Sequence, residues 1–137
     1  MANKEGFIIE LSSRSEIWWK YNATLMCGCF DSTGARIGFA SAESFVAEVG
    51  SGLRERPADI DPHRSLTLET PSCDHLLLYV YIVPHRLPEH NDVSHTQPFD
   101  VQLTVSHDGR RISRERIAIN QWSGCSLEMR IPSEKSR

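Results

Sequence analysis

The clearest pattern along the chain is an alternation of apolar and polar positions near the C-terminus. It runs through residues 99–106 and again through 125–131, as expected for strands with one buried and one solvated face. Asp108-Gly109, a preferred pair for a tight hairpin turn, precedes a return strand over 110–119. The apolar positions of that return strand change parity partway, which indicates a β-bulge near residues 113–115. This part of the chain therefore predicts three antiparallel strands.

A second pattern, in the middle of the chain, predicts a strand that is buried on both faces. Residues 76–83 are apolar at every position, and such a run needs cover on each side, as in the centre of a sheet. The segment 65–70 before it alternates like a half-buried strand. The polar, proline-bounded segment 84–98 after it predicts a long loop.

The first third of the chain mixes strand signals with one helical pattern. Strand-forming residues fill the segments 6–11, 17–30 and 35–40. In the segment 41–53 the apolar residues recur at helical spacing instead. They are Ala42, Phe45, Val46, Val49 and Leu53. Ser41 is a suitable N-cap for this segment, so we predict one short amphipathic α-helix there.

These elements predict a mainly β fold. Seven or eight strands with frequent turn signals and one helix indicate an antiparallel β-sandwich of the immunoglobulin-like or C2-like kind. Strands and helices do not alternate along the chain, which argues against a parallel α/β sheet. The 137 residues suit a single domain, 1–137, with one core.

Charge and composition narrow the partners that we expect. The formal net charge of -3 provides no basic field for nucleic acid or an anionic membrane. The N-terminal residues lack the apolar core of a signal peptide, and no apolar run approaches the ~20 residues of a membrane helix. We therefore expect a cytoplasmic protein, with its four cysteines as free thiols and with no cofactor.

Metal binding is the alternative function that the sequence offers. His85, His90 and His95 lie five residues apart in the long loop, and Asp59 and Asp61 lie in another loop. Imidazoles suit zinc, and loop aspartates of C2-type sandwiches suit calcium. The competing interpretation is a solvated polar loop and ordinary turn aspartates, because neither spacing is compact.

The Cys27-Gly28-Cys29 segment has two interpretations. It places two soft metal donors on one face of a strand, but a zinc site needs two further ligands. Leu25 shares that face, and free cysteines are among the most buried residues. We therefore expect both thiols in the core.

Aromatic residues point to a different function. Trp18 and Trp19 are neighbours, so on a regular strand they face opposite sides, and one ring lies outside the core or under a loop. Tyr79 and Tyr81 raise the same question on the doubly apolar strand. Exposed aromatic patches commonly mark interfaces. The competing interpretation is that the helix and the long loop cover both faces.

The function predicted first is therefore a non-catalytic protein-interaction or structural module that self-associates, most simply as a homodimer. Its interface would use Trp18, Trp19, Tyr79 and Tyr81. A calcium- or zinc-binding domain comes second. A hydrolase-type enzyme comes third, because the sequence contains no nucleophile elbow, phosphate-binding loop or dinucleotide fingerprint.

Overall fold

A computed structural model describes residues 6–50, 55–60, 64–88, 96–107 and 109–131 of the chain. Within these residues the chain forms eight strands and one 3-10 turn. In chain order they are β1 (Phe7–Ser12), η1 (Trp18–Lys20), β2 (Tyr21–Phe30), β3 (Arg36–Ser44), β4 (Ser65–Glu69), β5 (His75–Pro84), β6 (Phe99–His107), β7 (Arg110–Ile119) and β8 (Cys125–Ile131).

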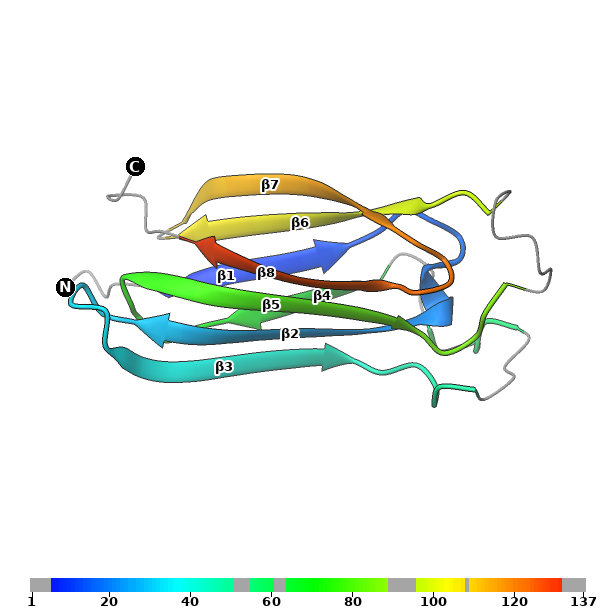
Figure 1. The fold of residues 1–137 in the computed structure, drawn as a ribbon, viewed down its shortest axis with the longest axis horizontal. Coiled ribbons are helices and arrows are strands. Elements are labelled where there is room, and N and C mark those ends of the chain that lie inside the picture. The colour runs from blue at the N-terminus through cyan, green and yellow to red at the C-terminus, as the bar shows by residue number, and fades with distance from the viewer. Residues whose placement is uncertain (1–5, 51–54, 61–63, 89–95, 108, 132–137) are drawn as a thin grey trace.

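The strands make two antiparallel sheets that pack face to face. The first sheet has the order β4-β1-β6-β7 and the second has the order β3-β2-β5-β8. In Figure 1 the second sheet lies in front of the first, with β3 at its lower edge. The predicted antiparallel β-sandwich is therefore confirmed. The described residues include no helix that is long and apolar enough to cross a bilayer.

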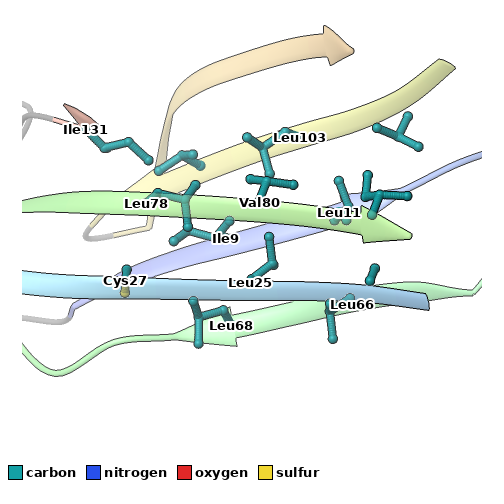
Figure 2. Close-up of a cluster of buried hydrophobic side chains, with 14 of the residues drawn as sticks. Ile9, Leu11, Leu25, Cys27, Leu66, Leu68, Leu78, Val80, Leu103 and Ile131 are labelled. Carbon is teal, nitrogen blue, oxygen red and sulfur yellow. The ribbon is translucent and has the colours of Figure 1, made fainter. Parts of the chain in front are cut away.

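The core fills the space between the sheets because alternate residues of each strand point inward. In the second sheet Leu25 of β2 pairs with Val80 of β5, which in turn pairs with Leu127 of β8. In the first sheet Ile9 pairs with Val105. Figure 2 shows side chains from both sheets meeting between them. The period-two pattern of the sequence thus specifies which face of each strand is buried.

The β-bulge predicted in the hairpin of β6 and β7 is present. Val105 pairs with Ser113, and the next residue of β6, Ser106, pairs with Arg111. Ile112 is therefore the extra residue of β7, one position before the predicted range. The bulge explains why the apolar positions of this strand change parity.

The predicted helix over 41–53 is wrong in the part that the structure describes. Residues 41–44 continue β3, where Ala42 lies opposite Leu25 of β2, and residues 45–50 contain no helix. The side chain of Asn22 holds the chain beyond β3, since its Oδ1 accepts from Val46 N at 2.7 Å and its Nδ2 donates to Ala47 O at 2.7 Å. The pairing of β3 with β2 and the hydrogen bonds of the Asn22 side chain thus outweigh the helical spacing of the apolar residues. Residues 51–53 lie outside the described part.

Candidate interaction surface

The outer face of the second sheet carries a band of apolar and aromatic side chains. Alternate residues of β5 point away from the core, as strand geometry requires, and they are apolar because residues 76–83 are apolar at every position. Of these, Leu77 and Tyr79 are half-buried, whereas Tyr81 and Val83 are 37% and 43% exposed. Phe39 of β3, at 57% exposed, and Met26 of β2 share this face. We call this set the outer band; it consists of Met26, Phe39, Leu77, Tyr79, Tyr81 and Val83.

Strand pairing arranges the outer band into rows across the sheet. Tyr79 lies between Met26 of β2 and Glu128 of β8. Leu77 lies between Gly28 and Arg130, and Gly28 in turn pairs with Phe39. The rings of Tyr79 and Tyr81 are parallel, with their centroids 6.3 Å apart. The apolar side chains therefore form one continuous surface.

Charged residues lie on the two strands at the edges of the outer band. Arg36 and Glu43 lie on β3, and Glu128 and Arg130 lie on β8; all four are exposed. An apolar centre with a polar rim is the usual anatomy of a protein interface. In Figure 1 no described segment crosses in front of this sheet. The predicted doubly apolar strand thus has one face in the core and one face that the described residues leave uncovered.

The two tryptophans differ from the prediction. They lie in the 3-10 turn η1, not on a regular strand, so their rings are not forced to opposite faces of a sheet. Trp18 is 1% exposed and Trp19 is 8% exposed. Both rings are therefore buried and neither lies on the outer surface, although Trp19 lies outside the main core cluster. Tyr79 and Tyr81 lie on the outer face as expected.

Sequence reasoning missed Phe39 and Met26, which broaden the outer band by two strands. The alternation in residues 21–30 was visible, but the two residues join the tyrosines only through strand pairing. Met26 is opposite Tyr79, and Phe39 is opposite Gly28. Pairing the segments 21–30 and 36–44 as a hairpin in the correct register would have placed both residues on the face of the tyrosines.

The residues proposed for metal binding do not form a site in the described part of the chain. Asp59 is exposed and His85 is 1% exposed, whereas Asp61, His90 and His95 lie outside the described residues. Among the residues that the structure describes, no group of three or more His, Cys, Asp or Glu side chains is placed to hold a metal ion.

His85 is a buried structural residue at the end of β5. Its Nε2 donates a hydrogen bond to the Trp19 carbonyl oxygen at 2.7 Å, and its backbone N–H donates to Lys20 O. The carbonyl oxygen of His85 accepts a hydrogen bond from Gly50 N. Because Nε2 carries the hydrogen, the neutral ring presents Nδ1 as an acceptor, and that atom is buried with no hydrogen-bond partner among the described residues. The imidazole therefore ties β5 to η1.

His85 should make the stability of the protein depend on pH. Burial lowers the pKa of His85 below its usual 6.5; the hydrogen bond to Trp19 opposes this change, and the charges of Arg64 and Arg86 add to it. As the pH falls, the unfolded chain takes up this proton first. The contribution of His85 is thus complete above about pH 6.5 and is lost at lower pH.

The measurement is the free energy of unfolding of wild type and His85→Gln between pH 7.5 and 5. Glutamine keeps an N–H donor but does not titrate. We expect the wild type to lose more stability than His85→Gln over this range. Equal losses in the two proteins would contradict the assignment.

Two of the four cysteines are core residues, and Cys73 and Cys125 are half-buried against the core. Cys27 and Cys29 are fully buried on the inner face of β2, as expected. Burial raises the pKa of Cys29 to about 11 and that of Cys73 to about 12. Since the thiolate is the nucleophile, burial favours the protonated, less reactive form of these two thiols near neutral pH.

Comparison with known proteins adds no functional assignment. The chain matches no family model and no curated protein. Among solved structures, it is similar to a domain of unknown function, DUF4425, from Bacteroides vulgatus ATCC 8482, with a TM-score of 0.41 and 11% identity over 95% of this chain and 94% of that one. A DUF4425 family protein from Bacteroides ovatus ATCC 8483 gives a TM-score of 0.39 and 9% identity over 93% of both chains. Likenesses this weak indicate no function for the chain.

Proposed function

We propose that the chain is a non-catalytic protein-interaction module that self-associates through the outer band. The observation that carries this proposal is the apolar surface of Phe39, Tyr81 and their neighbours, which no described segment covers. The sandwich has a complete core on the other side of the same sheet, so folding does not require these side chains to be apolar. We infer a cytoplasmic location as well, and the four free cysteines support it.

The charges beside the outer band favour a second copy of the chain as the partner. Consider a two-fold axis that runs across the strands, between the row of Leu77 and the row of Tyr79. It would place Arg36 of one copy opposite Glu43 of the other, because these residues lie at opposite ends of β3. The same axis would place Arg130 of β8 opposite Glu128. Each pair would form twice, as an isologous interface requires.

The size of the outer face is sufficient for a weak dimer. Residues on one face of a strand repeat every ~6.8 Å and neighbouring strands lie ~4.8 Å apart, so five rows on four strands cover about 30 Å by 20 Å. That is about 600 Å² for each copy and about 1,200 Å² for the pair, the lower limit for a stable interface. We therefore expect dissociation in the micromolar range.

Sedimentation velocity over a concentration series tests the proposal. We expect the wild type to be dimeric at a few hundred micromolar and Phe39→Glu to be monomeric, because the new carboxylate would be buried in an apolar interface. The matched control is Ile8→Glu, which alters an exposed apolar residue on the outer face of the other sheet. A monomeric wild type, or an equal effect of Ile8→Glu, would show that the proposal is wrong.

Exchanging charges tests the two-fold arrangement separately. Arg36→Glu and Glu43→Arg should each weaken the dimer, because each places like charges opposite one another. The double variant restores opposite charges and should recover dimerisation. If the single variants weaken the dimer and the double variant does not recover it, the outer band pairs in another orientation.

A further inference from the structure

The outer face of the first sheet holds a hollow with an unusual concentration of positive charge. It has a volume of about 830 Å³, and Arg14, Arg114 and Arg116 line it together with Gln102 and Asp100. Gln102 of β6 pairs with Ser12 at the end of β1 on one side and with Arg116 of β7 on the other. Arginines therefore lie on both sides of the polar outer face of β6. We call this hollow the arginine groove.

Acidic partners among the described residues do not balance these arginines. With the Gln102 amide oriented so that its oxygen faces Arg114, the guanidinium donates to that oxygen from Nη2 at 2.7 Å and also from Nε, and this amide carries no charge. Arg116 Nε lies 3.9 Å from Asp100 Oδ2, and the two side chains are 80% and 57% exposed, so the pair is too long for a hydrogen bond and is well solvated. Arg14 is exposed, and we find no acidic partner for it among the described residues.

The local backbone holds the arginine groove in place. Ser13 is 6% exposed; its Oγ donates to the Asp100 carbonyl oxygen at 2.7 Å and accepts from Ser15 N at 3.1 Å. These bonds fix the segment that carries Arg14 against β6. Gln102 fixes the plane of the Arg114 guanidinium in the same way. The Arg114 guanidinium and the backbone that carries Arg14 are thus held in place before any ligand arrives, which lowers the entropy lost on binding.

We propose that the arginine groove binds a phosphate group. Three guanidinium groups against one carboxylate leave a surplus of about two positive charges, which matches a phosphate dianion. Its several oxygens can accept charge-assisted hydrogen bonds from more than one arginine. The hollow is larger than a single phosphate, so the ligand is a phosphate ester, either a small molecule or a phosphorylated side chain of a protein. The groove and the outer band lie on opposite sheets, and neither proposal depends on the other.

Calorimetric titration tests this at constant ionic strength with three probes: inorganic phosphate, a phosphoserine peptide and the same peptide unphosphorylated. We expect saturable binding of phosphate, weakened about tenfold or more by Arg114→Gln and by Arg14→Gln, as the loss of one charge-assisted contact predicts. The matched control is Arg111→Gln, since Arg111 lies on the same face of β7, opposite Ser106, and does not line the groove. Unchanged melting temperatures would show that the variants are folded.

The peptides identify the source of the phosphate. Tighter binding of the phosphoserine peptide than of inorganic phosphate indicates that the ligand is a phosphorylated protein. If the phosphoserine peptide and inorganic phosphate bind with equal affinity, the ligand is a small phosphate ester. Equal binding of the two peptides would overturn the proposal. It would also be overturned if phosphate does not saturate, or if Arg111→Gln weakens binding as much as Arg114→Gln, because the attraction would then be diffuse.

Discussion

Trp18→Ala is expected to lower the free energy of unfolding by about 3–5 kcal/mol, the usual cost of truncating a core tryptophan. The Trp18 ring is 1% exposed and packs against Tyr21 and Phe99, with ring centroids 6.5 Å and 6.3 Å away. Its Nε1 donates to the Arg64 carbonyl oxygen at 3.2 Å. Alanine would leave a large cavity at the end of the sandwich and remove the donor for that carbonyl. Urea unfolding followed by circular dichroism measures the change.

Phe39→Ala is the control for this experiment. Phe39 is 57% exposed in the outer band, so its truncation should change the stability of the monomer by less than about 1 kcal/mol. Phe39→Ala should weaken dimerisation and Trp18→Ala should not, since Phe39 lies in the proposed interface and Trp18 does not. If Trp18→Ala instead gives a stable monomer, the tryptophan is an interface anchor after all.

The β-sandwich was predictable because local alternation carries the information. The segments 99–106 and 125–131 alternate strictly, and each turns its apolar face toward the core, buried in β6 and half-buried along most of β8. The continuous apolar run at 76–83 correctly predicts a strand inside a sheet, β5, with neighbours on both sides. Period-two patterns survive folding because a shift of one residue would expose the whole buried face.

The tryptophans and the helix could not be predicted, because tertiary contacts decide them. A short 3-10 turn before β2 removes the strand geometry on which the argument about Trp18 and Trp19 depended. At 41–44, pairing with β2 overrides helical spacing that the sequence does contain. Local propensity is weak beside such contacts.

The two surfaces differ in how far the sequence reveals them. Tyr79 and Tyr81 were predictable members of the outer band because their strand is apolar on both faces. The arginine groove was not predictable: Arg14 and Arg114 are far apart in the chain and meet only because β1 and β7 flank β6. The overall charge of -3 conceals this local surplus of positive charge.

Arg64→Met is expected to cost about 3 kcal/mol, because Arg64 joins the two sheets at one end of the sandwich. It immediately precedes β4 of the first sheet, while its guanidinium donates to Trp18 O at 3.1 Å, to Tyr21 O at 2.7 Å and to Ser44 Oγ at 2.8 Å in and beside the second. Burial lowers the pKa of Arg64 to about 10, so the group remains charged at neutral pH. Methionine fills part of the volume but leaves the two carbonyls without this donor, at about 1–3 kcal/mol for each buried group.

Arg64→Lys separates charge from geometry, and denaturant unfolding measures both variants. The guanidinium carbon lies 4.8 Å from the centroid of the Trp18 ring, so lysine can keep the cation over the ring but cannot donate in three fixed directions. We expect lysine to recover less than half of the loss. Arg64→Met should also couple to Trp18→Ala in a double-mutant cycle, since the two side chains are in contact. Full recovery by lysine would show that Arg64 acts through its charge alone and does not clamp the sheets, whereas strict additivity of the two substitutions would show that Arg64 and Trp18 act independently.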